Sequence, residues 1–64
     1  MKKELREYLA EKTPGWQKMS SLELDKEVRQ RWKAGEFKKL VTATMDDSGK
    51  AVKVGSGYYS YVEF

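Results

Sequence analysis

The sequence predicts an α+β fold in which two helices precede a three-stranded antiparallel β-meander. Two features give this prediction. Over the first half of the chain, apolar residues recur at the three- and four-residue spacing of a helix face, whereas from Leu40 onward they alternate with polar residues as in a half-buried strand. Turn-forming residues, mainly glycine and aspartate, divide the second half into three short runs. With 64 residues, the chain is expected to form one domain over residues 1–64.

The first helix is expected over residues 2–12. Leu5, Tyr8 and Leu9 lie at positions i, i+3 and i+4 and form one apolar stripe among charged residues. Pro14 then ends the helix, because proline disfavours the helical conformation of the residue before it.

The second helix is expected over residues 20–34. Ser20 and Glu23 have the spacing of a capping box, in which the serine side chain accepts a hydrogen bond from the first turn. Gly35 is a suitable residue to follow the last turn. In a chain this short, Trp16 is expected to join the second helix at the centre of the core. The apolar residues of this helix recur every four positions: Leu24, Val28 and Trp32.

The three strands are expected to form two successive hairpins, with a four-residue loop at residues 46–49 and a three-residue loop at residues 55–57. These loops would pair Val41 with Val54 across the first hairpin and Val54 with Tyr58 across the second. A loop longer or shorter by one residue would exchange the two faces of the affected strand. The inner face would carry Val41, Ala43, Val52, Val54, Tyr58, Val62 and Phe64.

The composition argues against most catalytic and metal-binding functions. The chain has no histidine and no cysteine, so it lacks the side chains of the common catalytic triads, of thiolate or imidazole metal sites and of disulfides. Asp46 and Asp47 lie in a turn and supply too few oxygen ligands for a calcium site. We therefore expect no enzymatic activity, no cofactor and no bound metal.

The chain is expected to be cytoplasmic, without a membrane partner. No apolar stretch approaches the roughly 20 residues of a membrane span, and the first residues lack the apolar segment of a signal peptide. The net charge of +3 is compatible with nucleic-acid binding and equally with an ordinary soluble surface. A homodimer is one alternative, because pairing of two copies would protect the edge strands of so small a sheet.

Basic residues are concentrated in the second helix and just after it. In one interpretation they contact the phosphates of a nucleic acid, where basic side chains gain affinity by releasing counterions. In another, the acidic start and basic end of the helix complement its dipole without any partner. The second interpretation accounts less well for the two lysines beyond the helix. The candidate contacts are Lys26, Arg29, Arg31, Lys33, Lys38 and Lys39.

The solvent face of the expected sheet gives a second candidate site, formed by Tyr59, Tyr61 and Lys53. Tyrosine rings on an open sheet stack on the bases of single strands at about 1–3 kcal/mol per base. Tyrosine is also enriched among the energetically dominant residues of protein interfaces. Cross-strand aromatic pairs stabilise small sheets by about 0.2–1 kcal/mol without any partner. The sequence leaves these three interpretations open.

The order of the expected elements resembles a compressed winged-helix DNA-binding domain. The resemblance is carried by SLEL at residues 21–24, which resembles the start of the second helix of that family. It is also carried by AGEFKKLV at residues 34–41, which is similar to the point where the recognition helix enters the wing strands. The resemblance implies that the second helix contacts DNA. It also implies a wing around residues 46–49, with Lys50 and Lys53 as further DNA contacts.

Two functions follow as hypotheses. The leading one is a small non-enzymatic nucleic-acid-binding protein, with DNA favoured, that acts as a regulator or accessory factor. The alternative is a protein-interaction module, such as an inhibitor or adaptor of a larger intracellular protein, that binds its partner through the exposed sheet face.

Overall fold

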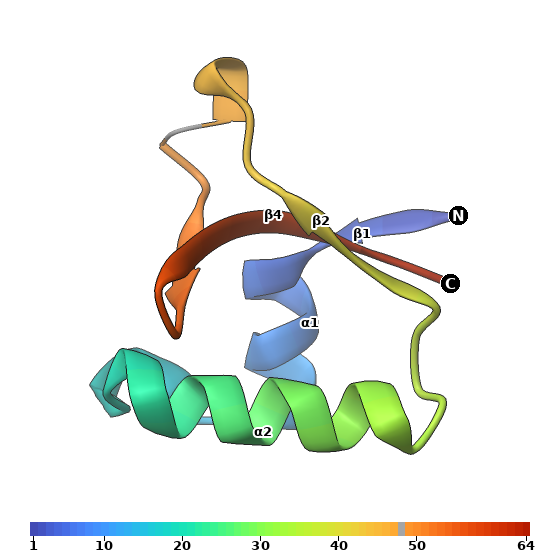
Figure 1. Cartoon of the computed structure of the whole chain (residues 1–64), viewed down its shortest axis with the longest axis vertical. Coiled ribbons are helices and arrows are strands. Elements are labelled where there is room, and N and C mark those ends of the chain that lie inside the picture. Colours follow the sequence, from blue (N-terminus) through green and yellow to red (C-terminus); the bar gives the residue numbers. More distant parts are fainter. Residues whose placement is uncertain (48) are drawn as a thin grey trace.

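The computed structural model describes residues 1–47 and 49–64 and combines two α-helices with an antiparallel sheet of four strands (Figure 1). The predicted α+β class is confirmed, but the described residues form one strand more than expected. The elements are β1 (Lys2–Glu4), α1 (Leu5–Lys12), the 3₁₀ turn η1 (Trp16–Lys18), α2 (Ser21–Lys33), β2 (Lys39–Thr42), the 3₁₀ turn η2 (Met45–Asp47), β3 (Val52–Val54) and β4 (Gly57–Glu63).

The start of the chain forms a strand where the sequence predicted helix. Lys2 of β1 lies opposite Glu63 and Glu4 lies opposite Tyr61, so the first residues complete an edge of β4 that would otherwise be open. The helix begins only at Leu5, where the apolar stripe starts. The three residues of β1 contribute nothing to that stripe, and pairing with β4 decides their conformation.

The second helix agrees with the prediction and is a single element. The side-chain oxygen of Ser20 accepts a hydrogen bond from the backbone N–H of Glu23 at 3.2 Å, as expected of a helix cap. Leu24 and Val28 are buried. The chain leaves the helix through Gly35, whose φ of 81° lies in the left-handed region that favours glycine.

Neither tryptophan lies at the centre of the core, which corrects the prediction. Trp16 and Trp32 are half-buried and pack against the edge of the core. The indole N–H of Trp32 donates to the backbone oxygen of Lys38 at 3.0 Å, and its ring stacks on Phe37 with centroids 5.9 Å apart. Phe37 takes the buried position instead and meets the ring of Tyr8 edge-on at 5.4 Å. At the edge of the core, the indole N–H of a tryptophan can still donate a hydrogen bond, as that of Trp32 does to the backbone of Lys38.

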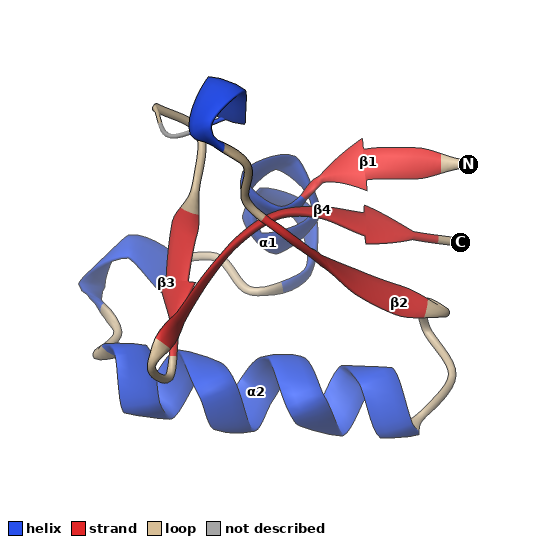
Figure 2. Ribbon diagram, turned by 45° about the horizontal axis from the view of Figure 1, so that its top comes forward, coloured by secondary structure: helices blue, strands red, loops and turns tan. Residues whose placement is uncertain are grey.

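The sheet is built around β4, and this overturns the predicted meander. Tyr59 of β4 pairs with Thr42 of β2 and also with Val52 of β3, so β2 and β3 lie on opposite edges of β4. The expected pairing of Val41 with a residue of β3 is wrong, because Val41 lies opposite Tyr61 of β4. Both helices pack on one face of this sheet (Figure 2).

The segment between β2 and β3 explains why they do not pair. The backbone N–H of Asp47 donates to the backbone oxygen of Thr44 at 3.1 Å, and the Asp47 carboxylate accepts a hydrogen bond from the Thr44 hydroxyl at 2.8 Å. The polar groups of Thr44 and Asp47 thus bond to each other within the turn. They do not require β2 and β3 to pair as a tight hairpin. The expected loop at residues 46–49 includes Ser48, which lies outside the described residues.

The hairpin between β3 and β4 is present but is tighter than expected. Val54 pairs with Gly57, so the loop contains two residues and not three. Gly55 makes this turn with a φ of 63°, and its N–H donates to the backbone oxygen of Ser21 at 2.9 Å. A Cβ atom at position 55 would lie 3.1 Å from a carboxylate oxygen of Asp25, so the hairpin tip fits closely against α2.

The shorter loop exchanges the roles of two tyrosines. Tyr58, expected in the core, lies opposite Lys53 and is 55% exposed. Tyr59, expected on the solvent face, packs against the core. An irregularity in the β2–β4 pairing then restores the alternation, so Val62 is buried and Tyr61 faces outward, as predicted.

The core lies between the helices and the inner face of the sheet. Leu40 of β2 is buried opposite Val62, whereas Val41 and Ala43 are only half-buried, contrary to their expected inward orientation. Ser60 is buried as well, and no hydrogen-bond partner for its hydroxyl is found among the described residues. The buried apolar residues are Leu5, Tyr8, Leu9, Leu24, Val28, Phe37, Leu40, Val52, Val54 and Val62.

Candidate nucleic-acid interface

Arg31, a predicted nucleic-acid contact, is used inside the fold. Its Nε donates to Glu27 at 2.9 Å, its Nη1 lies 3.3 Å from both oxygens of Glu36, and its Nη2 donates to the backbone oxygen of Lys12 at 2.8 Å. The guanidinium therefore joins the end of α1, the end of α2 and the loop before β2. We call Tyr8, Glu27, Arg31 and Glu36 the polar clasp.

The surroundings of the polar clasp shift the pKa values of two of its members, Tyr8 and Glu36. The Tyr8 hydroxyl donates to Glu36 at 2.6 Å. Burial of the ring, followed by the neighbouring Glu36 carboxylate, raises the pKa of Tyr8. The hydrogen bond from Tyr8 and the charge of Arg31 lower the pKa of Glu36. The single guanidinium of the clasp is already shared by the carboxylates of Glu27 and Glu36, so the clasp has little capacity to bind a further anion.

The exposed side of α2 offers fewer free cations than its sequence suggests. Arg29 forms a salt bridge with Asp25 at 2.8 Å. Lys26 and Lys33 are exposed and form no salt bridge among the described residues. Leu22, which lies on the same helix, is 66% exposed.

The outer face of the sheet carries two aromatic rings, each with a lysine above it. We define the outer face by Tyr58 and Tyr61 of β4 with Lys2, Lys39 and Lys53. The ammonium of Lys2 lies 5.3 Å from the ring centre of Tyr61, and that of Lys53 lies 6.0 Å from the ring centre of Tyr58. Both distances are within the range of cation–π attraction. The face therefore presents aromatic surfaces and positive charge together.

Tyr61 is held in place by the turn after β2. Its hydroxyl donates to the Asp47 carboxylate at 3.3 Å. The hydrogen bond from Thr44, together with the one from Tyr61, lowers the pKa of Asp47 and keeps it charged. Among the described residues no hydrogen-bond partner is found for the Tyr58 hydroxyl, and that residue is 55% exposed.

Lys39 and Lys2 lie on either side of one acidic residue of the central strand. Both pair with Glu63 of β4, one from each neighbouring strand. Lys38 precedes Lys39 in the chain and donates its backbone N–H to the backbone oxygen of Glu63 at 2.6 Å. Lys50, a predicted wing contact, lies 4.0 Å from Glu4, at the outer limit of a salt bridge.

Salt bridges leave an excess of free positive charge. Among the described residues they engage four of the 13 basic side chains but five of the ten acidic ones. Nine basic and five acidic side chains are left without a salt bridge. The unpaired basic residues are Lys2, Arg6, Lys12, Lys18, Lys26, Lys33, Lys38, Lys39 and Lys53.

An apolar hollow borders the outer face beside Tyr58. It has a volume of about 400 Å³ and includes Met45, whose side chain is 94% exposed. Exposed apolar side chains gathered in this way are typical of contact surfaces. The hollow is lined by Ala43, Thr44, Met45, Ala51 and Tyr58.

The structure therefore divides the predicted site residues. Arg29 and Arg31 form salt bridges within the fold, whereas in the part of the chain that the structure describes no salt bridge engages Lys26, Lys33, Lys38 or Lys39. Of the residues predicted for the sheet face, Lys53 and Tyr61 lie on it but Tyr59 does not. Sequence reasoning missed Lys2 and Tyr58. Lys2 was predicted to lie in the first helix. Only a β3–β4 loop one residue shorter than expected would have placed Tyr58 on the solvent face.

Comparison with known proteins gives no match: no family model fits the sequence, and no curated protein or solved structure is significantly similar to it. The described residues contain no helix that is long and apolar enough to cross a membrane. They also contain no group of three or more acidic side chains placed to hold a metal ion.

Proposed function

We propose that this chain is a small, non-enzymatic nucleic-acid-binding protein, a regulator or accessory factor, and that it holds a single strand on its outer face. The supporting observation is that Tyr58 and Tyr61 share an exposed face of the central strand and each has a lysine ammonium within 6.0 Å of its ring. Rings of this kind stack on bases at about 1–3 kcal/mol each. Lysines beside them are placed to contact the phosphates of the same strand.

Free charge favours the sheet over α2 as the contact surface. The helix has lost Arg31 to the polar clasp and has Arg29 paired with Asp25. The outer face has three lysines without a salt bridge among the described residues, and it combines them with two tyrosine rings, of which Tyr58 is exposed and Tyr61 half-buried. A single strand, whose bases are accessible, suits such a surface better than a duplex.

The experiment is a fluorescence anisotropy titration with labelled single-stranded DNA, single-stranded RNA and duplex DNA at about 50 and 200 mM salt, a range over which phosphate contacts weaken strongly. The single strands should bind more tightly than the duplex. Tyr58→Ala should weaken single-strand binding about 5- to 150-fold, which corresponds to the loss of one base stack.

A charge-matched pair of variants locates the contact. The double variant Lys2→Gln/Lys53→Gln lowers the net charge as much as Lys26→Gln/Lys33→Gln, but the first changes the outer face and the second changes α2. We expect the first to weaken single-strand binding more than the second. A larger loss from the α2 variant, together with a preference for duplex, would instead support the DNA contact that the winged-helix resemblance implies.

The apolar hollow supports a second candidate function, a protein-interaction module such as an inhibitor or adaptor of a larger protein. Met45 and Tyr58 together expose apolar surface that a nucleic acid does not need. The simplest partner to test is a second copy, by sedimentation over a wide range of protein concentration. Self-association that is lost in Met45→Lys but kept in Lys26→Gln would establish the hollow as a protein contact.

A further inference from the structure

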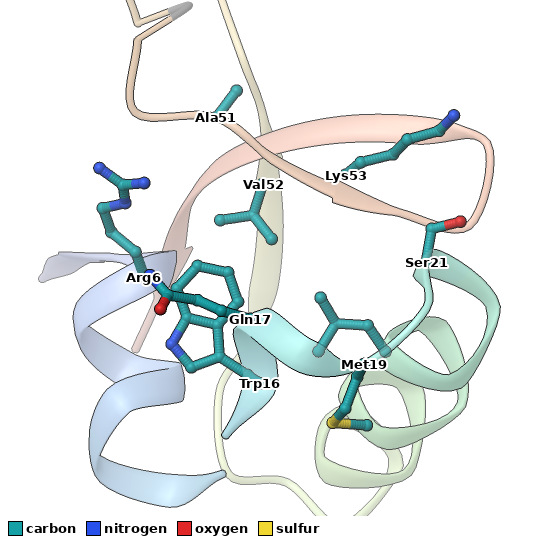
Figure 3. A pocket seen from close by; sticks show the side chains of 9 residues that line it. Arg6, Trp16, Gln17, Met19, Ser21, Ala51, Val52 and Lys53 are labelled. Carbon is teal, nitrogen blue, oxygen red and sulfur yellow. The ribbon is translucent and has the colours of Figure 1, made fainter. Parts of the chain in front are cut away.

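A second open cleft lies on another side of the molecule, between α1, η1, the start of α2 and β3 (Figure 3). Its volume is about 650 Å³. Apolar side chains form much of its lining, and the half-buried indole of Trp16 lies along one wall. The lining residues are Arg6, Trp16, Gln17, Met19, Ser21, Leu24, Ala51, Val52 and Lys53.

The charge of the cleft suits an acidic ligand. Arg6 of α1 brings a basic side chain to the cleft, whereas the side chain of Lys53 on β3 extends away from Trp16, with its ammonium 6.0 Å from the ring centre of Tyr58 (Figure 3). Neither forms a salt bridge among the described residues, and no acidic residue lines this first hollow; the one acidic residue nearby, Glu7, lines the adjoining hollow on α1. An acidic group placed there would gain a partner without displacing an existing one.

One wall of the cleft is the free edge of β3. Tyr58, opposite Lys53, directs its backbone oxygen toward β2, where it accepts from Ala43 at 3.0 Å. Lys53 and Tyr58 are therefore a non-hydrogen-bonded pair of the antiparallel ladder. In such a pair, the backbone N–H and C=O groups of the two residues point away from each other. Those of Lys53 therefore point away from β4, to the edge along the cleft. No hydrogen bond from outside the ladder to the Lys53 backbone is found among the described residues.

The backbone of Gly55 faces the same edge as that of Lys53, and it already has a hydrogen-bond partner outside the sheet. Gly55, two residues after Lys53, donates its N–H to the backbone oxygen of Ser21 at 2.9 Å. The first turn of α2 thus covers the tip of the edge. Lys53 and Ala51 lie further along it, beside the cleft.

The cleft continues past Trp16. A second hollow of about 330 Å³ lies on α1 and shares Arg6, Trp16 and Gln17 with the first. Glu7 and Ala10 complete its lining. The two hollows together form a groove that is longer than one side chain needs, which favours an extended ligand.

We propose that this groove binds an extended acidic peptide segment of a partner protein by adding a strand to β3. The peptide backbone would exchange hydrogen bonds with Lys53, one of its apolar side chains would pack on Trp16, and an acidic side chain would pair with Arg6. This is a known mode of peptide recognition, in which backbone bonds give affinity and side-chain pockets give specificity. The site uses the backbone edge of Lys53 and the side chains of Trp16 and Arg6, and shares with the outer face only Lys53, whose side chain lies over Tyr58; it does not depend on nucleic-acid binding.

The test uses isotope-labelled protein and a set of N-acetylated, C-amidated hexapeptides in which glutamate alternates with valine, leucine or phenylalanine. A control set has glutamine in place of glutamate. Binding of an acidic peptide should slow hydrogen exchange of the Lys53 amide, and Arg6→Gln should weaken it roughly fivefold or more. Lys18→Gln makes the same charge change on η1 outside the cleft and should bind normally.

A backbone variant separates strand addition from simple charge attraction. Lys53→Pro removes the outward N–H without removing a donor from the β3–β4 ladder, whereas Lys53→Gln removes the same charge and keeps the N–H. We expect folded Lys53→Pro to bind more weakly than Lys53→Gln. The proposal is overturned if no peptide of the acidic set binds at millimolar concentration, if the glutamine set binds as well, or if the Lys53 amide is unaffected. These outcomes leave the oligonucleotide titrations unchanged.

Discussion

The polar clasp and the outer face contain the same kinds of side chain, but they use them differently. In the clasp, the hydroxyl of Tyr8 and the guanidinium of Arg31 both bond to Glu36. On the outer face, Lys2 and Lys53 lie over tyrosine rings and form no salt bridge among the described residues. In the clasp, the basic side chain bonds directly to two carboxylates and stabilises the fold, whereas on the outer face the lysines lie over rings and stay available to a partner, even though Asp47 bonds to Tyr61 there.

The largest expected effect comes from comparing the two tyrosines that the sequence placed on the wrong faces. Tyr59→Ala should lower the free energy of unfolding by about 2 kcal/mol, because it removes a ring that packs against the core. Tyr58→Ala should cost less than about 1 kcal/mol, since only an exposed cross-strand contact is lost. Urea denaturation followed by circular dichroism measures both. The opposite order would mean that the hairpin has a three-residue loop.

Removal of the central arginine should break the polar clasp. Arg31→Ala leaves Glu27 and Glu36 without their shared cation. We expect the free energy of unfolding to fall by about 1–2 kcal/mol, a modest loss because the side chains of the salt bridges are partly exposed to water. Single-strand binding by the folded variant should fall no more than in Lys26→Gln. A stable Arg31→Ala protein that no longer binds nucleic acid would contradict the structural role given to this residue.

Acid should weaken the clasp in a defined direction. The pKa of Glu36 is lowered by its hydrogen bond from Tyr8 and then by Arg31, so the folded protein releases this proton more readily than the unfolded chain. The contribution of the Glu36 carboxylate to the free energy of unfolding is fully present above the pKa of an unfolded glutamate, about 4.3. It is lost as the pH falls through the lower pKa that Glu36 has in the folded protein. Unfolding measured between pH 7 and 3 should be less acid-dependent in Glu36→Gln.

The acid experiment needs a control for net charge. Glu7→Gln removes an exposed carboxylate outside the clasp. Glu11 and Asp47 also have lowered pKa values, through hydrogen bonds from Lys3 and Thr44, so Glu36→Gln should reduce the acid dependence without removing it. An acid dependence that is the same in Glu36→Gln and the wild-type protein would mean that Glu36 is not held by the clasp.

The smallest expected effect concerns the buried hydroxyl of Ser60. Because no partner for it is found among the described residues, Ser60→Ala should leave stability unchanged or raise it by up to about 1 kcal/mol. Thermal unfolding is sufficient to measure this. A clear loss of stability would show that the hydroxyl has a partner, such as a buried water.

The helices were predictable because their signals are local. The Ser20 cap, the buried Leu24 and the left-handed Gly35 all depend on residues within a few positions of one another. The tryptophans were not placed correctly, because the position of Trp32 depends on a backbone oxygen in the following loop. Residues 2–4 were assigned to the helix because their partner, β4, lies at the other end of the chain.

The sheet was harder to predict because small local differences change its faces. One residue in the β3–β4 loop exchanges Tyr58 with Tyr59, and a β-bulge then returns Tyr61 to its predicted side. For the candidate site, the i, i+4 spacing on the second helix predicts the pairs Asp25–Arg29 and Glu27–Arg31, and both salt bridges are confirmed. The bonds of Arg31 to Glu36 and to the backbone of Lys12, and the position of Lys2 over Tyr61, follow only from the fold.

The most direct test of the proposed interface is a chemical-shift map of isotope-labelled protein as a short single-stranded oligonucleotide is added. The account predicts that the largest shifts fall on the outer face, at Tyr58 and Tyr61, with Lys2, Lys39 and Lys53, and that the side-chain signals of Arg31 stay unchanged. Shifts concentrated at Lys26 and Lys33 of α2, with the tyrosines unaffected, would contradict it.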